Sequence, residues 1–201
     1  MSTTLYLVRH ALKEKAVGDV PITKEGILQA EATARYFGQL HAPITAITAS
    51  PLRRAQETAG YIAVETHAAV ETDSRLRERA NWGDLPGQSF EEFIAMWERC
   101  TREPAYLPPV GDSAKLAGQR MASVCVEMAL KHPPDSHIVL VTHGGIITDF
   151  LVHTLAEQDL NRWHPEFIRL QSGLIPECSI TRLNYAEGEF EMASFAMIEH
   201  L

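Results

Sequence analysis

Two runs of large apolar residues lead to a histidine, and this feature limits the fold more than any other in the chain. Residues 5–8 lead into Arg9 and His10, and residues 138–141 lead, one residue later, into His143. Uninterrupted apolar runs of this length are typical of strands buried on both faces of a parallel sheet. Arginine and histidine are costly to bury without a partner. The strand ends therefore predict a site at the carboxyl edge of such a sheet, where ligands bind in open α/β folds.

Strand-like and helix-like segments alternate along the chain. Strands are expected at 4–9, 44–50, 69–73 and 137–145 and as a closing pair around Gly188, and helices over 23–40, from 50, near 89–102, over 112–131 and after 145. Thr23 is the expected N-cap of the first helix, and Ser50 and Pro51 are expected to open the second. The alternation predicts an α/β fold: a three-layer α/β/α sandwich with a mostly parallel sheet, helices on both faces and a closing C-terminal hairpin. We expect one domain over residues 1–201, with a lid-like insertion at 74–111.

Composition excludes several classes of partner. The net charge of −8 argues against a nucleic-acid surface, because phosphate backbones require a basic face. The three cysteines lie far apart without a CxxC pair, which is typical of reduced thiols. No apolar run approaches the roughly 18–20 residues that span a bilayer, and the N-terminus lacks a signal-peptide pattern. We expect a cytoplasmic protein with neither nucleic acid nor a membrane as partner. Its oligomeric state is open, a homodimer included.

Two arginines at the start of a predicted helix are expected at the same carboxyl edge of the sheet as the strand-end residues. His143 is followed by Gly144, Gly145 and a helix, and the free N–H groups at a helix N-terminus favour anions. Arg53 and Arg54 occupy the first turn of the helix from residue 50. Arginine binds phosphoryl oxygens in a bidentate manner, and a neutral histidine can attack phosphorus. The pattern predicts a cationic pocket for a phosphoryl group that includes one of these two arginines.

Five segments resemble the histidine phosphatase superfamily, also called phosphoglycerate-mutase-like. They are RHA (9–11), DVPITKEGILQAE (19–31), SPLRRAQETA (50–59), VTHGG (141–145) and the tail from 178, CSITRLNY. They are similar to the family's motifs in order along the whole chain. The tail looks most like that of the family's broad-specificity phosphatases.

The resemblance implies a role for each basic residue of the predicted pocket. His10 is implied to be the nucleophile that becomes phosphorylated. The motif register selects Arg54, whereas helical periodicity leaves Arg53 and Arg54 equivalent; Arg53 is expected to pair at the surface. The implied phosphoryl-binding residues are Arg9, Arg54, His143 and Gly144, with Thr23 as a further candidate.

The resemblance also implies a general acid that protonates the leaving oxygen. The family's acid is a glutamate in a Leu-x-Glu motif shortly after the third strand, which selects Glu78 in RLRERANWGDLPG (75–87). From composition alone Glu78 would be a solvated surface charge. Its neighbours Arg77 and Arg79 would hold it ionised unless burial raises its pKa.

The chain departs from the family pattern in three places around the site. Ala11 stands where glycine is usual, and its methyl group is expected to crowd the phosphate loop. The segment 11–22 is short and lacks the Trp-Asn and basic segment of longer members, so part of the phosphate-binding set is missing or supplied elsewhere. Residues 82–87 are out of step with the family's Gly-x-Trp-Glu-Gly. Substrate recognition is expected from 74–111, with candidates Arg79, Trp82 and Arg102.

Together these features predict a metal-independent phosphomonoester phosphatase of the histidine acid type. It would hydrolyse a small phosphorylated metabolite through a phosphohistidine at His10, without a cofactor. The short chain favours a phosphatase over a mutase, because a mutase must hold a second phosphorylated metabolite and exclude water. Three alternatives stay open: a phosphoglycerate-mutase-type phosphotransferase, a protein phosphohistidine phosphatase, and a pseudoenzyme that binds phosphorylated ligands without turnover.

Overall fold

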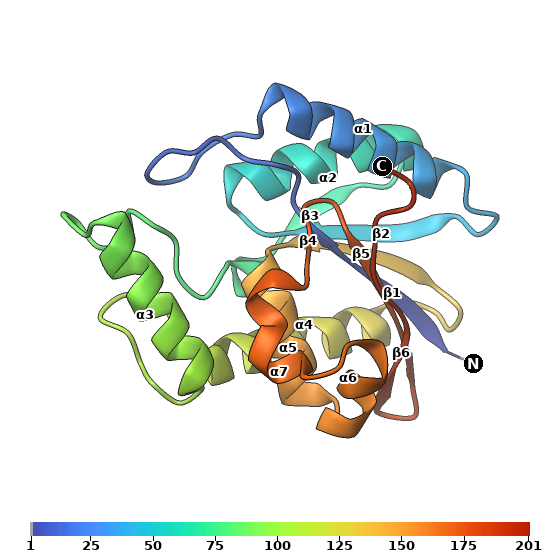
Figure 1. Ribbon diagram of the computed structural model, residues 1–201. Coiled ribbons are helices and arrows are strands. Elements are labelled where there is room, and N and C mark those ends of the chain that lie inside the picture. Colours follow the sequence, from blue (N-terminus) through green and yellow to red (C-terminus); the bar gives the residue numbers. More distant parts are fainter. Residues whose placement is uncertain (1) are drawn as a thin grey trace.

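Within residues 2–201, the part of the chain that the computed structural model describes, six strands form one mixed sheet (Figure 1). Their order across the sheet is β3-β2-β4-β1-β5-β6. The strands are β1 (Thr3–Arg9), β2 (Ile44–Ala49), β3 (Val70–Thr72), β4 (His137–Thr142), β5 (Ile180–Ala186) and β6 (Glu189–Met197). The first four are parallel to one another, and β5 and β6 form the antiparallel hairpin at the end of the chain. The mostly parallel sheet and the closing hairpin are both confirmed.

Helices cover both faces of the sheet, as expected for a three-layer sandwich (Figure 1). The helices α1 (Lys24–Gly38) and α2 (Arg53–Thr66) lie on one face, and α4 (Ala114–Lys131) and α5 (Gly144–Thr154) lie on the other. Side chains of β1 alternate between the two cores: Leu5 and Leu7 pack with α4 and α5, whereas Tyr6 and Val8 pack with α1 and α2. This double burial explains why residues 5–8 of the strand are all apolar and do not alternate with polar residues.

The pairing of β1 with β4 brings the two strand ends together. Arg9 is the register partner of Thr142, so His10 and His143 are the next residues of two adjacent parallel strands. The backbone N–H of His10 donates to the Thr142 carbonyl at 2.9 Å. The predicted meeting of these histidines at the carboxyl edge is therefore confirmed, and it is a direct result of strand register.

The start of α1 agrees with the sequence prediction, whereas the start of α2 differs from it. Thr23 caps α1 as expected, because its hydroxyl accepts the Gly26 N–H at 2.9 Å. The expected start of α2 at Ser50 and Pro51 is wrong: Leu52 is the N-cap, and the helix begins at Arg53. The physical reason is that Ser50 still belongs to the sheet edge, where its N–H donates to the Val141 carbonyl at 2.9 Å.

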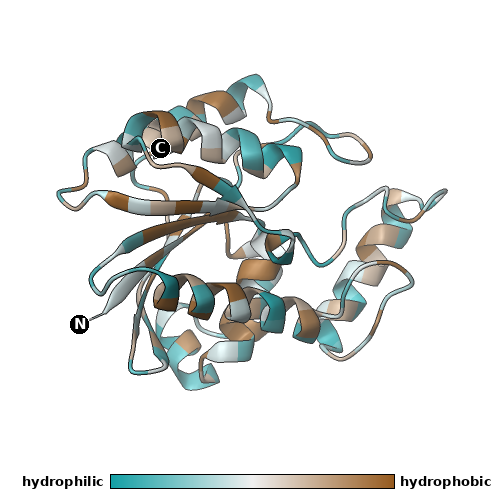
Figure 2. Ribbon diagram, turned by 180° about the vertical axis from the view of Figure 1, so that it is seen from behind, coloured by the Kyte–Doolittle hydropathy of each residue, from teal (hydrophilic) through white to brown (hydrophobic). Residues whose placement is uncertain are grey.

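The region between β3 and α4 leaves the sheet and carries the short 3₁₀ helix η1 (Ser74–Leu76) and the helix α3 (Phe90–Arg102). Helix α3 stands away from the sheet, and hydrophobic residues occur along it as well as on the strands (Figures 1 and 2). Three short elements before the final hairpin were not expected from the sequence: α6 (Glu157–Trp163), α7 (Phe167–Leu170) and η2 (Gln171–Gly173). Among residues 2–201, no helix combines the length and hydropathy needed to cross a bilayer.

Candidate active site

His10 leaves the end of β1 with both ring nitrogens engaged. Its Nδ1 lies 2.8 Å from the carbonyl oxygen of Ala11, and its Nε2 lies 3.1 Å from the Arg54 Nε, which donates to it. A carbonyl can only accept and a guanidinium can only donate, so the proton sits on Nδ1 and the lone pair on Nε2. The surrounding groups thereby present a nitrogen that can act as a nucleophile.

His143 lies beside His10, with the ring centroids 5.1 Å apart. It is the N-cap residue of α5, and its Nε2 lies 2.8 Å from the hydroxyl oxygen of Ser50. The Ser50 hydroxyl can donate to Nε2, which leaves the proton on the opposite nitrogen, Nδ1. Ser50, which the sequence suggested only as a helix cap, thus orients the second histidine.

The surroundings of both histidines favour the neutral imidazole. Burial lowers the pKa of His10 well below 6.5, and the nearby charge of Arg54 lowers it further. The same two causes, in the same order, lower the pKa of His143. A protonated imidazole has no lone pair to attack with, so this environment keeps His10 in its reactive form at neutral pH.

Three buried nitrogen atoms around His10 have no hydrogen-bond partner among residues 2–201: Arg9 Nε, Arg54 Nη1 and His143 Nδ1. Other atoms of the two arginines are held in place. Arg9 pairs with Glu177 and donates to a backbone carbonyl, and the Arg54 Nη2 donates to the Asn81 Oδ1 at 3.2 Å. Buried donors without acceptors are costly, and an oxyanion would satisfy all three at once. The arrangement therefore fits a phosphoryl group.

Glu78 faces the same cavity from the loop after η1. Its Oε2 accepts the backbone N–H of Gly145 at 2.9 Å, and its Oε1 accepts the N–H of Arg79 at 3.0 Å. Neither flanking arginine pairs with Glu78: Arg77 forms an ion pair with Asp84 at 3.0 Å, and Arg79 forms one with Asp149 at 2.8 Å. Gly145 follows the phosphate-side Gly144, so the carboxyl group lies beside the predicted phosphoryl site.

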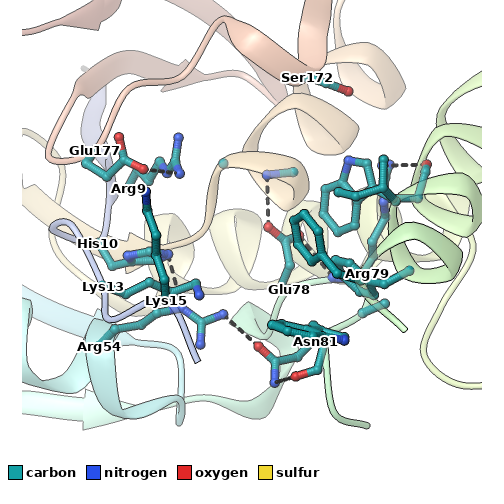
Figure 3. A pocket seen from close by; sticks show the side chains of 18 of the residues that line it. Arg9, His10, Lys13, Lys15, Arg54, Glu78, Arg79, Asn81, Ser172 and Glu177 are labelled. Atoms are coloured by element: carbon teal, nitrogen blue, oxygen red, sulfur yellow. Dashed lines mark hydrogen bonds and ion pairs between the residues drawn. The ribbon is translucent and has the colours of Figure 1, made fainter. Parts of the chain in front are cut away.

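The cavity has a volume of about 660 Å³ and opens between the sheet edge and α3. Figure 3 shows Arg9, His10, Lys13, Lys15 and Arg54 on one side and Glu78 with Arg79 on the other. The predicted residues Arg9, His10, Arg54, Glu78, Gly144, Arg79 and Trp82 line it.

Sequence reasoning missed several further lining residues. Lys13 and Lys15 come from the short segment 11–22, which thus supplies basic groups of its own. Burial lowers the pKa of Lys13, and Arg54 and Arg9 add to that effect. Asn81 and Glu177 also line the cavity and hold the two arginines. The one sequence signal that could have indicated these residues was the position of the two lysines shortly after the first strand.

Three sequence predictions about the edges of the site are wrong. Thr23 does not line the cavity, because its hydroxyl caps α1 and donates to the Leu12 carbonyl at 3.3 Å. Arg102 does not line it either, since it lies at the far end of α3. The methyl group of Ala11 does not crowd the pocket: it is fully buried in a small apolar cluster with Ile22, Ala30 and Cys178.

Comparisons with known proteins agree with the fold and with the family resemblance. The family model for the histidine phosphatase superfamily (branch 1) matches residues 5–197. A probable phosphoglycerate mutase, GpmB, of Yersinia pestis (strain Pestoides F) is 30% identical, with 97% of this chain and 90% of that protein covered. The uncharacterized phosphatase PhoE of Bacillus subtilis (strain 168) is 26% identical, with 99% and 97% covered. A solved phosphoserine phosphatase of Entamoeba histolytica, in complex with 3-phosphoglyceric acid, has a TM-score of 0.74 at 22% identity, with 98% of each chain covered.

Proposed function

The chain belongs to the histidine phosphatase superfamily, and we propose that it is a metal-independent phosphomonoester phosphatase of the histidine acid type that works through a phosphohistidine at His10. One observation carries the proposal. A neutral His10, with its lone pair on Nε2, adjoins three buried donors that have no partner in the described chain. A nucleophile next to a cluster of donors that can bind an oxyanion is what phosphoryl transfer to a side chain requires.

In the first step the His10 Nε2 attacks phosphorus, and the bond from phosphorus to the ester oxygen breaks. Arg9, Arg54 and His143 bind the phosphoryl oxygens and balance the negative charge that spreads over them in the transition state. The Glu78 carboxyl group gives its proton to the departing oxygen, which leaves as an alcohol.

In the second step water attacks the phosphorus of the phosphohistidine. The Glu78 carboxylate takes a proton from that water, and the bond from phosphorus to Nε2 breaks. Inorganic phosphate leaves, and His10 and Glu78 return to their starting states. Glu78 gives one proton to the leaving alcohol and regains one from the attacking water, so the steps balance with this side chain and water, and the proposal invokes no metal or cofactor.

The proposal also covers the kind of substrate, the cellular compartment and the role of residues 74–111. The substrate is a small phosphorylated molecule, and the enzyme acts in the cytoplasm. Residues 74–111 serve as a lid-like part of one domain, because Glu78 and the lining residues of α3 all come from this segment.

A phosphoglycerate mutase is the second candidate, favoured by the 30% identical relative named as a probable mutase. A mutase transfers the phosphoryl group back to a metabolite, whereas a phosphatase transfers it to water. Phosphoryl exchange between 2- and 3-phosphoglycerate, faster than phosphate release, would identify the mutase.

The central experiment uses p-nitrophenyl phosphate in the presence of a chelator. Wild type should release p-nitrophenol, and samples quenched in alkali should carry a base-stable phosphoryl group that is lost on later treatment with acid. His10→Ala should lose both signals, whereas the control His41→Ala, an exposed loop histidine, should retain them. Equal release by wild type and His10→Ala would contradict the phosphohistidine mechanism.

Tight phosphate binding without release would indicate a pseudoenzyme. Hydrolysis confined to phosphohistidine-bearing protein would indicate a protein phosphohistidine phosphatase.

A second experiment tests the acid. Glu78→Gln should lose most activity on alkyl phosphates and least on p-nitrophenyl phosphate, because a good leaving group needs no proton. A uniform loss across leaving groups would argue against the assigned role.

A further inference from the structure

We propose that the substrate's leaving group is an apolar chain or ring without a carboxylate, held against the α3 wall of the cavity. This wall is defined as Phe90, Phe93, Ile94 and Trp97. The inference rests on the proposed function, since it assigns a direction to the phosphoester within the cavity. It concerns the side of the cavity that the phosphoryl chemistry leaves unused.

The cavity has a charged side and an apolar side. Figure 3 places Arg9, His10, Lys13, Lys15 and Arg54 together on one side, across from Glu78. The α3 wall and Trp82 line the cavity too, and they carry no charge. A phosphate bound at His10 therefore has cations around it and an apolar surface facing it.

Trp97 fixes where the leaving group must pass. A Cβ built on Gly145 would lie 2.5 Å from the Trp97 Cη2 and 2.8 Å from the Glu78 Oε1. The indole ring thus lies against the Gly145 backbone, directly beside the carboxyl group that protonates the leaving oxygen. The first atoms after that oxygen consequently meet Trp97, and Phe93 continues the surface, with its ring centroid 5.9 Å from the indole.

Arg79 is the cation on this side of the cavity, and its guanidinium already has partners within the protein. It is 2% exposed and donates to the Asp149 Oδ1 at 2.8 Å and the Thr101 Oγ1 at 2.6 Å. Its carbon Cζ lies 3.8 Å from the centroid of the Trp97 ring. A substrate carboxylate would have to break this buried ion pair to reach it, which is strongly unfavourable. Arg79 therefore supports the apolar wall and is no anchor for an acid.

Two residues of the α3 wall are exposed to solvent. Phe90 is 52% and Ile94 37% exposed, and Cys100 is the one fully buried residue of α3. An apolar surface that borders a cationic site is typical of a site for an amphiphilic ligand. A phosphate monoester of an apolar alcohol or phenol matches both sides, whereas phosphoserine or a phosphoglycerate would place a carboxylate on the apolar one.

The test compares ethyl, butyl and hexyl phosphates, whose leaving groups have similar reactivity. We expect kcat/KM to rise by at least about tenfold from ethyl to hexyl, since each buried methylene contributes roughly a two- to fourfold gain. The phosphate ester of 4-hydroxybutanoate, which has a carboxylate in place of the terminal methyl group of butyl phosphate, should react at least about tenfold more slowly than butyl phosphate.

Variants of the α3 wall should remove the dependence on chain length. Trp97→Ala should flatten it, Trp97→Phe should keep part of it, and Trp163→Ala, an exposed tryptophan on α6 that does not line the cavity, should leave it unchanged. Ile94→Ser changes a surface position of the wall and serves if Trp97→Ala does not fold.

Failure of this inference is distinct from failure of the proposed function. Hydrolysis of all esters with no preference for chain length, or with a preference for the carboxylate, would overturn the inference and leave the phosphatase intact. If no ester is hydrolysed, binding of ethyl- and hexylphosphonate by calorimetry still decides. Equal affinities would overturn the inference, and at least about tenfold tighter binding of hexylphosphonate would support it.

Discussion

Acidification below pH 6.5 should destabilise the empty protein through its two buried histidines. Burial and Arg54 lower the pKa values of His10 and His143, so both stay neutral in the folded state. In the unfolded chain both would take up a proton near pH 6.5. The unfolded state then binds more protons than the folded state, and stability falls as the pH falls.

The size of the effect follows from proton linkage. Between pH 6.5 and 5.5 each histidine that stays neutral on folding lowers the free energy of unfolding by about 1 kcal/mol, so the pair lowers it by about 2 kcal/mol. For a chain of this length that corresponds to a decrease in Tm of about 4–8 °C. Most carboxylates contribute below this window, because their ordinary pKa values lie near 4. Asp149 acts in the opposite direction, because burial raises its pKa to about 8, but it remains in both proteins of the comparison below and cancels there.

Urea denaturation at pH 6.5 and 5.5 provides the measurement, with wild type compared with the double variant His10→Gln/His143→Gln. Other partly buried histidines, such as His137 and His200, also have lowered pKa values but remain in both proteins, so they cancel in the comparison. The double variant should lose about 2 kcal/mol less than wild type across the window. An equal loss in the two proteins would refute the claim that the pair is neutral in the folded state.

Three further predictions follow from individual contacts. Gly118→Ala should lower the free energy of unfolding by about 1–3 kcal/mol, because its Cβ would lie 2.5 Å from the Asp149 carbonyl oxygen. Gly60→Ala in α2 places its Cβ where no atom lies within 4 Å, so it should raise the free energy of unfolding by about 0.5–1 kcal/mol. Urea denaturation measures both variants, and equal effects would contradict the close packing of α4 on α5. Thr23→Ala should lower stability by about 1 kcal/mol through loss of the α1 cap while leaving KM unchanged, so a raised KM would show a part in substrate binding. Ser50→Ala should weaken inhibition by inorganic phosphate by about five- to tenfold, because the second histidine of the site loses the 2.8 Å partner that orients it, and unaltered inhibition would exclude that role.

The sequence predicts the frame of the molecule because its signals are local. Residues 5–8 and 138–141 read as buried strands, and their parallel pairing follows from the alternation of elements, so the meeting of His10 and His143 could be anticipated. The N-cap at Thr23 is equally local, since one hydroxyl meets an N–H three residues away. The choice of Arg54 came from the family motif, and its hydrogen bond to His10 agrees with that choice.

Contacts between distant segments could not be predicted in the same way. Ser50 looked like a helix cap because its partner, His143, is remote in sequence. Arg79 looked like a charge beside Glu78, but its partner Asp149 lies on α5. The inward direction of Ala11 depends on packing from three other segments. Such pairings leave no periodic pattern, because each is decided by the tertiary arrangement of elements.

The register between β1 and β4 ties the site to the order in which the chain folds. Both strands lie in the middle of the sheet, yet almost two thirds of the sequence separates them. Contacts between remote segments form slowly, because the loop between them must first lose its conformational freedom. The two histidines come together only when that pairing is complete. Recovery of activity during refolding therefore reports the closing of the whole sheet, and partially folded chains that already contain native helices remain inactive.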